Sequence, residues 1–287
     1  MSHGRSPPVP SVSPRTGPRS IVLALALAAA GCYAGRNYLD PSGPRYAGPA
    51  PALASTPIAD HVLQVATFNI EGAEKIGRAL EVIRSNSELR DADILLLQEM
   101  DAEGTERIAK ALGMGWVYYP ATLRRGRGFG NAILSRWPIR DDEKLLLPHG
   151  AIFGGLRRIA TVATVRVEGV DVRVYSVHLA TPVNQRASDR VDQMETVFAD
   201  AVRYPRVVVG GDLNSRSLAQ HGLWDGFTWL TPAGPRTTWF ARVDHILTKG
   251  FVPPASRVSG TIRDNRGASD HLPVWARVEM GAGRDAG

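Results

Sequence analysis

Cysteine and lysine are both scarce in this chain. A single cysteine, Cys32, occurs among the 287 residues, which excludes an intrachain disulfide and any cysteine-based metal cluster. Four of the 34 basic residues are lysines and the rest are arginines. Nucleotide composition can produce such a bias as easily as selection for arginine chemistry. The net charge of +6 is therefore weak evidence for nucleic-acid binding.

Long hydrophobic runs are also lacking, and the most apolar stretch, Ile21–Ala30, has ten residues. As a helix it covers about 15 Å, half the hydrocarbon thickness of a bilayer, so we expect no spanning helix. It follows a basic, acid-free segment and precedes Gly31-Cys32, an order that predicts a secretory signal over residues 1–31. The segment resembles a bacterial lipoprotein signal, in which Cys32 is lipidated. The alternative is an ordinary secretory signal with a chance cysteine.

Export is expected on either interpretation. The protein would be a membrane-anchored lipoprotein facing the periplasm or the cell exterior, or otherwise a secreted or periplasmic protein. Residues 32–60 are rich in Pro, Gly, Ala and Ser, a composition that predicts an extended tether without a helix or central strand. Residues 61–280 are expected to form one domain and residues 281–287 a disordered tail. A monomer is expected.

Short β-rich runs alternate with amphipathic stretches in the domain. Strands are predicted at 62–70, 93–99, 116–119, 130–135, 143–147, 158–167, 171–179, 207–212, 242–248, 257–263 and 272–279. Helices are predicted at 73–89, 103–112 and 187–202. Many strands with few helices indicate an α/β fold in which two mixed sheets pack together with helices outside.

Polar side chains stand where predicted strands end. They are Asn69, Glu99, His178 and Asp212. Ligands of α/β proteins gather at such ends, and with Glu71 and Asn214 these residues offer the oxygen ligands that Mg²⁺ prefers. A glutamate at a strand end is usually a solvated rim residue, but burying Glu99 without a cation or donors would be costly. Gly-Asp-x-Asn around Asp212 is equally compatible with a plain Asx-turn.

A second group of residues combines aspartate with histidine. Asp270-His271 precedes the last predicted strand, and Asp244 precedes His245 in another. A histidine that removes a proton from water needs a carboxylate to fix its tautomer. The alternative for His271 is a strand cap, and His178 is equally compatible with a satisfied core histidine. Because it alternates with Asp244, His245 is expected to face outward.

The stretch Arg124–Gly128 contains glycines and is expected to be a mobile loop, either solvated or in contact with phosphate. The loops 122–130 and 217–241, which would recognise a substrate, follow no pattern that identifies it. Trp224, Trp229 and Trp239 are expected in the core rather than as base-stacking platforms.

Seven short motifs occur in a fixed order. They are Asn69-Ile-Glu71, Gln98-Glu99, Gly130-Asn-Ala-Ile-Leu-Ser135, Val177-His-Leu179, Gly211-Asp-Leu-Asn214, Val243-Asp244 and Ser269-Asp-His271. Together they resemble the endonuclease/exonuclease/phosphatase superfamily, which includes abasic-site endonucleases, pancreatic-type deoxyribonucleases, neutral sphingomyelinases and inositol-polyphosphate 5-phosphatases. The resemblance covers about residues 62–279. It implies a four-layer α/β/β/α sandwich with two mixed β-sheets packed face to face, and one or two Mg²⁺ or Mn²⁺ ions.

The resemblance also implies residue roles. The implied metal ligands are Glu99, Asn69, Glu71 and Asp270. The implied catalytic residues are His271, Asp212, Asn214, His178 and Asp244. Asn131, Arg190 and Gln193 are implied to support the site or to bind the substrate phosphate. His271 would be the general base or would hold the phosphate, Asp244 would orient it, and Asp212 would position or deprotonate the attacking water.

A divalent-metal-dependent phosphoesterase follows from these residues. Phosphoryl transfer needs an in-line nucleophile and neutralisation of charge on the phosphate oxygens, which a metal, two histidines and a water-holding aspartate can supply. We expect an exported, nuclease-like enzyme that hydrolyses a phosphodiester of nucleic acid. The alternatives are a lipid-directed phosphodiesterase or inositol-phosphate phosphatase at the membrane surface, reached through the lipid anchor, and a non-catalytic binding protein of the same fold.

Overall fold

The computed structural model describes residues 1, 37–50, 60–223, 226–252 and 258–281. The signal segment, its cysteine Cys32, Trp224 and residues 282–287 of the tail lie outside the described residues. Within the described ranges, no helix has the length and apolar character needed to cross a membrane.

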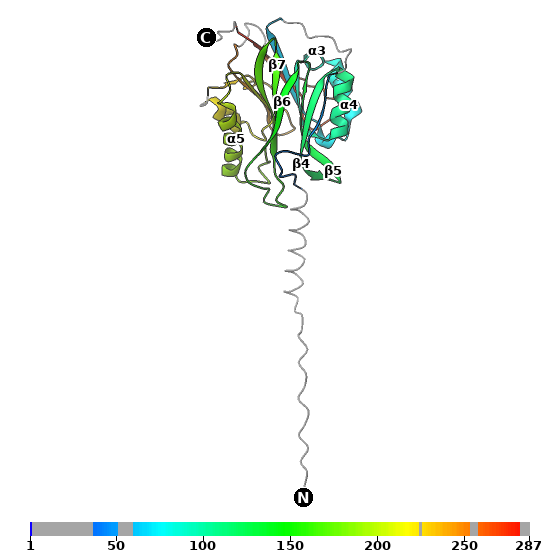
Figure 1. The fold of residues 1–287 in the computed structure, drawn as a ribbon, viewed down its shortest axis with the longest axis vertical. Helices are drawn as coiled ribbons and strands as arrows, with labels where there is room; N and C mark the ends of the chain where they lie inside the picture. The colour runs from blue at the N-terminus through cyan, green and yellow to red at the C-terminus, as the bar shows by residue number, and fades with distance from the viewer. Residues whose placement is uncertain (2–36, 51–59, 224–225, 253–257, 282–287) are drawn as a thin grey trace.

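Two β-sheets form the centre of the domain (Figure 1). The larger sheet has the order β1 (Tyr46–Gly48), β4 (Gly115–Arg124), β5 (Arg127–Ser135), β3 (Ile94–Met100), β2 (Val62–Asn69), β13 (Val274–Glu279) and β12 (Ser259–Thr261). The smaller has the order β10 (Thr228–Trp229), β11 (Asp244–Lys249), β9 (Val207–Asp212), β8 (Val170–His178), β7 (Ile159–Val167) and β6 (Ile139–Leu146). The pairs β2–β3 and β8–β9 are parallel and their neighbours antiparallel, so both sheets are mixed.

Helices cover the two outer faces. The larger sheet packs against α2 (Ile76–Ser85), α3 (Ser87–Arg90) and α4 (Ala102–Leu112), and the smaller against α5 (Ala187–Ala201). Short 3₁₀ turns, η1 (Glu71–Ala73) and η2 (Ser217–Leu223), follow β2 and β9. Figure 1 shows α5 and α4 on opposite sides of the paired sheets.

Between the sheets lies a continuous apolar layer that includes Val65, Leu96, Ile133, Val174 and Ile246. Both inner faces are therefore buried, and the outer faces pack against separate hydrophobic clusters under the helices. The four-layer α/β/β/α sandwich expected from the sequence is confirmed.

Topology brings the polar strand ends to one end of the sandwich. The parallel pairs β2–β3 and β8–β9 end together. Since β5, β11 and β13 run antiparallel to these strands, their starts lie at the same end. We call this end of the sandwich the site end. Its connecting segments are 70–75, 125–126, 147–158, 179–186, 213–216, 236–243 and 262–273.

Residues 37–50 depart from the predicted tether. They lie against the domain, with β1 paired to β4 and the nearly buried Lys144 donating from Nζ to the backbone carbonyls of Tyr38 and Gly43. Arg45 also pairs with Asp142, at 2.6 Å. The prediction was wrong for this segment because prolines, which exclude a central strand, are tolerated beside a short edge strand.

The loop predicted around Arg124 is instead a β-hairpin. Strands β4 and β5 pair to Arg124 and Arg127, leaving a two-residue turn of Arg125 and Gly126, with φ of 53° and 77°. Two central residues with positive φ are typical of a tight hairpin turn. Arg125 is held further by an ion pair with Glu74, at 2.6 Å.

The exposure of two side chains is the reverse of the prediction. His245 is fully buried and its Nδ1 accepts a hydrogen bond from Trp229 Nε1, at 3.2 Å, because the smaller sheet is covered on both faces. Trp239 is 85% exposed, since it lies at the tip of a turn rather than on a strand. The core position of Trp229 is confirmed.

Candidate active site

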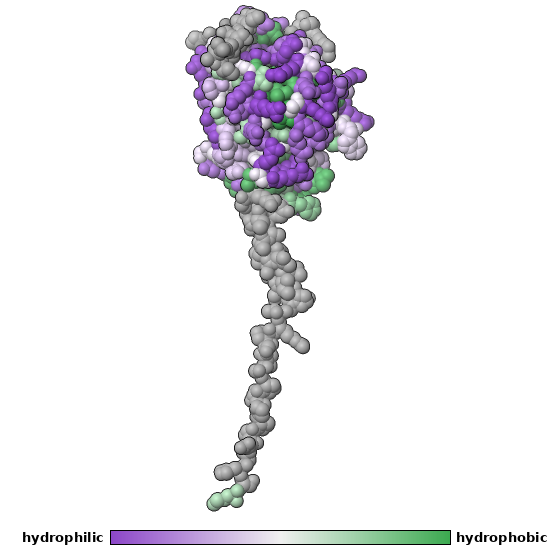
Figure 2. Space-filling view, turned by 90° about the vertical axis from the view of Figure 1, so that its right-hand side faces the viewer, coloured by the Kyte–Doolittle hydropathy of each residue, from purple (hydrophilic) through white to green (hydrophobic). Residues whose placement is uncertain are grey.

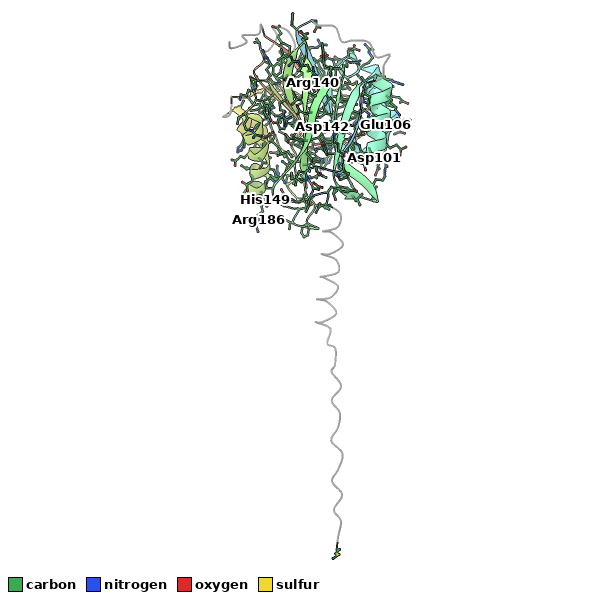
Figure 3. All side chains as sticks on the ribbon, viewed as in Figure 1. Asp101, Glu106, Arg140, Asp142, His149 and Arg186 are labelled. Carbon is green, nitrogen blue, oxygen red and sulfur yellow. The ribbon has the colours of Figure 1, made fainter. Side chains whose placement is uncertain are left out.

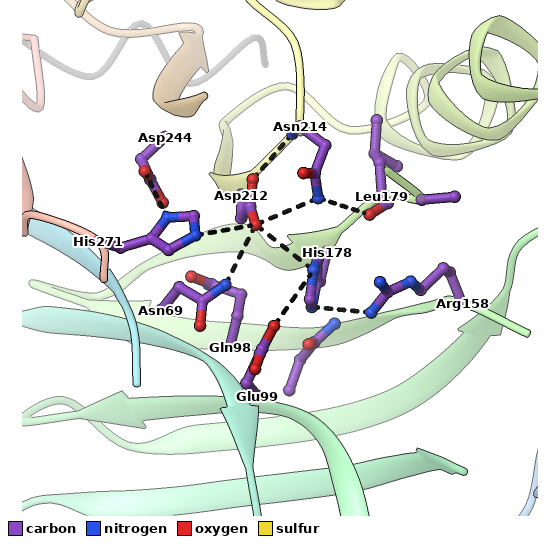
Figure 4. Close-up of polar contacts among 12 residues, drawn as sticks. Asn69, Gln98, Glu99, Arg158, His178, Leu179, Asp212, Asn214, Asp244 and His271 are labelled. Atoms are coloured by element: carbon purple, nitrogen blue, oxygen red, sulfur yellow. Dashed lines mark hydrogen bonds and ion pairs between the residues drawn. The ribbon is translucent and has the colours of Figure 1, made fainter. Parts of the chain in front are cut away.

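Asp212 is at the centre of a buried polar cluster at the site end (Figure 4). Its Oδ1 accepts the backbone N–H of Asn214 at 2.8 Å. Its Oδ2 accepts from the side-chain amides of Asn69, at 3.1 Å, and Asn214, at 3.2 Å. The same oxygen lies 3.4 Å from Nε2 of His178 and 3.7 Å from Nε2 of His271. Asn69 ends β2 of the larger sheet and Asp212 ends β9 of the smaller, so the hydrogen bond between them joins the two sheets at their ends.

Glycine at position 211 lets β9 present this carboxylate. Gly211 has φ of 145°, and a Cβ atom there would lie 1.9 Å from the carbonyl oxygen of Val177 in β8. Only glycine permits that approach with this backbone. The close contact sets Asp212 beside His178, which is its register partner on β8.

His271 and Asp244 form a second buried pair in the cluster. His271 Nδ1 lies 2.9 Å from Asp244 Oδ2. The backbone N–H of Asp244 donates to Thr237 Oγ1 at 3.2 Å, and that of His271 donates to Ser269 Oγ at 3.0 Å. Ser269 in turn donates to the carbonyl of Asn69, at 2.7 Å. Thr237 and Ser269 therefore fix the backbones that carry the Asp–His pair.

Burial and neighbouring charge shift the pKa values of these groups. Burial, reinforced by the charge of Asp244, raises the pKa of Asp212 to about 7. Burial alone would lower the pKa of His271, but the charge and hydrogen bond of Asp244 and the charge of Asp212 raise it to about 10. These shifts favour the cationic form of His271, and they make Asp212 a better proton acceptor near neutral pH than an ordinary carboxylate.

Arg158 fixes the tautomer of His178. Its Nη1 lies 3.1 Å from His178 Nδ1, and since a guanidinium can only donate, Nδ1 accepts and Nε2 carries the proton. That Nε2–H lies near Asp212 Oδ2 and, at 3.9 Å, Glu99 Oε1. Burial, then the charge of Arg158, holds the pKa of His178 well below its usual range. His178 is therefore a neutral hydrogen-bond donor.

Glu99 reaches the cluster through a β-bulge. The register of β3 on β5 shifts between Leu97 and Met100, and Glu99 has φ of 56°, an unusual conformation for a residue other than glycine. Bulges re-aim side chains in this way. The Glu99 carboxylate, 17% exposed, also pairs with Arg124 Nη1 at 3.2 Å.

Comparison with known proteins identifies the family. The model of the Endonuclease/Exonuclease/phosphatase family matches residues 66–271. The chain belongs to this family. The match confirms the family expected from the seven motifs. Members of this family are hydrolases that act on phosphoester bonds. Among curated proteins, no relative matches the chain.

Several solved structures of the endonuclease/exonuclease/phosphatase type share this fold. A protein of this family from Beutenbergia cavernae is 24% identical, with a TM-score of 0.63, over 77% of this chain and 72% of that one. Humanized D. rerio TDP2 is 17% identical, with a TM-score of 0.62, over 77% of this chain and 100% of that one. A family protein from Bacteroides thetaiotaomicron is 18% identical, with a TM-score of 0.58, over 77% and 98%.

Two of the four metal ligands that the family resemblance implies, Asn69 and Glu99, lie in the cluster. Glu71 instead pairs with Lys75, at 3.2 Å, and its side chain is 39% exposed. Asp270 is exposed, and its Oδ1 lies 3.5 Å from Ser269 Oγ, whose hydroxyl hydrogen is donated to Asn69. The structure thus places Glu71 and Asp270 around the cluster rather than within it.

The three residues expected to support the site brace its backbone. Asn131 Nδ2 donates to the carbonyls of Ile159 and Ser176, at 2.9 and 3.2 Å, and so joins the two sheets. Arg190 Nη2 donates to the carbonyl of Asn214 at 3.1 Å. Gln193 accepts from the backbone N–H of residue 180 and donates to the carbonyl of residue 148. A direct contact with substrate phosphate is not needed to explain any of them.

The residues present fit a divalent cation of the kind that family enzymes use. Asp212, Asp244 and His271 each have a possible ligand atom within 4.8 Å of the others, and of these the carboxylates of Asp212 and Asp244 remain able to bind a cation when His271 is protonated. One oxygen of Asp244, Oδ1, is buried without a hydrogen-bond partner, a costly condition that a cation would relieve. The carboxylate of Glu99 and the amide oxygen of Asn69 add oxygen ligands that suit Mg²⁺.

Sequence reasoning missed Arg158, Thr237 and Ser269 as parts of the site. Ser269 stood inside a quoted motif, and its place two residues before His271 was an available signal. Arg158 and Thr237 stood in segments without any motif. Their contacts with His178 and Asp244 arise from the packing of distant loops.

Proposed function

We propose that this protein is an exported, divalent-metal-dependent phosphodiesterase with nuclease-like chemistry. The observation that carries the proposal is the convergence of Asp212, His178 and the Asp244–His271 pair around one buried point, with Glu99 beside it. These side chains come from both sheets. Apolar side chains in their place would stabilise the fold at a lower cost in free energy than buried charges do, so stability alone does not explain this cluster.

Two different roles for Asp212 and His271 follow from their pKa values. His271, with its pKa raised to about 10 chiefly by Asp244 against the effect of burial, would hold the anionic phosphate as an imidazolium. Asp212, with its pKa raised to about 7 by burial, is suited to accept a proton from the attacking water near neutral pH. The amides of Asn69 and Asn214 orient the Asp212 carboxylate for that transfer.

His178 would stabilise the charge that grows on a phosphate oxygen. Because Arg158 occupies Nδ1, the Nε2–H of His178 is available to donate toward the point where Asp212 and Glu99 meet. A preorganised donor of this kind strengthens as charge develops and needs no reorganisation during the reaction.

A Mg²⁺ or Mn²⁺ ion would be held by Glu99 and Asn69, with Glu71 and Asp270 at the edge of the cluster. When bound, it would neutralise charge on the phosphate. Arg124, which pairs with Glu99 in this structure, would then be released toward the substrate.

A groove with basic side chains lies near the site. A groove of about 530 Å³ lies beside η1 and α2, and its lining includes Lys75, Arg78, Arg107 and Arg127. Lys75 also contacts Glu71, at the edge of the site. The lining also includes Glu74 and Glu103, and its basic side chains are suited to bind an anionic phosphate of either a nucleic acid or a lipid surface.

A substrate panel with Mg²⁺ or a chelator tests the proposal. DNA, RNA, sphingomyelin and inositol phosphates would each be incubated with the wild type, Glu99→Gln and His271→Ala. We expect hydrolysis of a phosphodiester that the chelator abolishes and that each variant reduces by about a thousandfold or more. Full turnover by His271→Ala on every accepted substrate would contradict the assigned roles, and would favour another location for the chemistry.

A further inference from the structure

Large hydrophobic side chains are exposed around the mouth of the site. In the described part of the chain, the site end exposes Ile152 (56%), Phe153 (74%), Val183 (79%), Trp239 (85%) and Phe240 (51%). They lie on three of the connecting segments that surround the Asp212 cluster: 147–158, 179–186 and 236–243. We call these five residues the apolar rim.

Backbone hydrogen bonds hold the rim in place. Ile152 donates its N–H to the carbonyl of Asn184 at 2.8 Å, which joins the segments that carry Phe153 and Val183. The turn that carries Trp239 is closed by bonds from Thr237 and Thr238 to Ala241, each 3.0 Å. Thr237 also accepts the N–H of Leu272, next to His271, at 2.7 Å. The rim is therefore fixed to the backbone that carries the candidate catalytic residues.

The exposed aromatic pair has the character of an interfacial anchor. Trp239 and Phe240 have ring centroids 5.2 Å apart in an edge-to-face arrangement. Tryptophan and phenylalanine are the side chains that insert at the boundary between lipid headgroups and acyl chains. Figure 2 shows hydrophobic side chains at the lower edge of the domain, below a face that is mainly hydrophilic. Figure 1 shows the β4–β5 hairpin at the same lower end.

The N-terminal segment enters the domain at this same end. Asn37 pairs with Thr122 near the end of β4, its Nδ2 donates to the carbonyl of Gly155 at 3.0 Å, and its Oδ1 accepts from the N–H of Arg157 at 2.9 Å. Because residues 37–50 pack on the domain, the stretch from Cys32 up to the domain is residues 32–36, which is five residues rather than the 29 of the predicted tether 32–60. Five residues span at most about 17 Å. A lipid on Cys32 would therefore hold the site end close to the bilayer.

Basic side chains accompany the rim. Arg186, Arg236 and Arg266 are exposed on connecting segments of the site end, and Figure 3 shows Arg186 at the lower end of the domain beside His149. Arginine near a membrane surface contributes attraction to anionic lipids. Apolar insertion and basic contacts act together at such surfaces.

We propose that the site end docks on a phospholipid bilayer through the apolar rim, and that it presents the phosphodiester of a lipid headgroup to the Asp212 cluster. The docking surface goes beyond the proposed function, whereas the choice of a lipid substrate rests on it. A bilayer suits the rim better than a protein partner, since the surface surrounds the mouth of the candidate active site, and the N-terminal segment, for which the sequence predicts a lipid anchor at Cys32, enters the domain beside it.

Vesicle binding by the full chain tests the docking surface. All proteins would carry Cys32→Ser, so that the segment before Asn37 contributes equally to every measurement. The rim variant is Phe153→Ser with Trp239→Ser. Its matched control is Val202→Ser with Val252→Ser, which replaces two exposed hydrophobic side chains at the opposite end of the sandwich. A third protein, Val183→Ser with Phe240→Ser, changes the rim at other positions.

Cosedimentation with vesicles of phosphatidylcholine containing about a quarter phosphatidylglycerol would measure binding. We expect both rim variants to bind about tenfold more weakly than the parent, and the opposite-end control to bind equally well. Equal binding by all four proteins would overturn the docking surface. An unchanged thermal unfolding midpoint would show that a variant with weaker vesicle binding is folded. Because the two rim variants replace different residues, a folding defect in one of them would not decide the result.

Hydrolysis separates the docking surface from the proposed function. With Mg²⁺, the rim variants should hydrolyse soluble bis(p-nitrophenyl) phosphate at the rate of the parent, and should release headgroups from vesicles about tenfold more slowly. Loss of vesicle binding without turnover of any phosphodiester by the parent would overturn the proposed function but support docking. Cleavage of DNA without release of headgroups would overturn the lipid substrate.

Discussion

At the scale of single residues, Asp244 determines the charge state of the histidine that it contacts. Its carboxylate and hydrogen bond outweigh the effect of burial, which by itself would disfavour the cationic form of His271. Thr237 holds the backbone of Asp244, and Ser269 that of His271. The backbones of both residues are therefore fixed, and a histidine that binds a phosphate at one position requires such a fixed orientation.

Replacing Asp244 by asparagine should separate charge from shape at this site. Asp244→Asn keeps the volume but removes the charge that stabilises the His271 imidazolium, so we expect kcat to fall by about a thousandfold. Steady-state kinetics on the substrate found by the panel would measure it. Asp264→Asn, an exposed change in the segment before β13, should retain wild-type kcat. A wild-type kcat in Asp244→Asn would exclude an orienting role.

Buried His245 predicts a loss of stability in weak acid. Burial lowers its pKa to about 4, below the value of about 6.5 expected in the unfolded chain. Between these values the unfolded state binds more protons, so this contribution is complete above pH 6.5 and is lost as the pH falls toward 4. At pH 5 the loss is about 2 kcal/mol.

Urea unfolding of the wild type and of His245→Leu, at pH 7.5 and pH 5, would measure this effect. The variant is less stable at both values because Trp229 Nε1 loses its acceptor. We expect its free energy of unfolding to change less between the two pH values, by about 2 kcal/mol. Parallel changes in the two proteins would show that His245 is not the group responsible.

At the scale of strands, the close contact between β8 and β9 is the feature that places Asp212 beside His178. Gly211→Ala would put Cβ 1.9 Å from the carbonyl oxygen of Val177, at a φ of 145°. The strands must then separate, and we expect a loss of about 3 kcal/mol in the free energy of unfolding. Denaturant titration would measure it.

Gly169→Ala is the matched control for this change. Gly169 also has positive φ, 83°, but a Cβ atom there meets nothing within 4 Å. Strain without a clash should cost about 1 kcal/mol. Equal losses in the two variants would attribute the effect at Gly211 to φ alone, and not to the approach of the strands.

The strands that carry the site were predictable because their apolar runs end in single polar residues. Asn69, Glu99, His178 and Asp212 end or nearly end their strands, as the pattern indicated. The contact of Arg158 with His178 was not predictable, because it depends on how the segment 147–158 folds over β8. The buried position of His245 was mistaken for a similar reason, since alternation along β11 says nothing of what covers its outer face.

At the scale of the whole molecule, the packing of residues 37–50 limits the distance between the site end and Cys32, the predicted lipid attachment site. Composition predicted a tether, yet two side chains of the domain, Lys144 and Asp142, bind this segment. The backbone of Thr122 in β4 also forms a β-bridge with Asn37. A proline-rich segment can therefore be an integral edge of a sheet. Sequence alone could not show this, because the partners lie about 100 residues away.

Two truncations would measure the contribution of this edge to stability. Removal of residues 1–36 leaves every described contact of the domain in place, and the free energy of unfolding should not change. Removal of residues 1–50 leaves Lys144, which is 3% exposed, without its two carbonyl acceptors, and Asp142 without Arg45. It also uncovers Trp116, which packs against Gly48. We expect a loss of about 3 kcal/mol by denaturant unfolding. Equal stability of the two truncated proteins would mean that the segment only rests on the surface, and that the distance between Cys32 and the site end is not fixed by it.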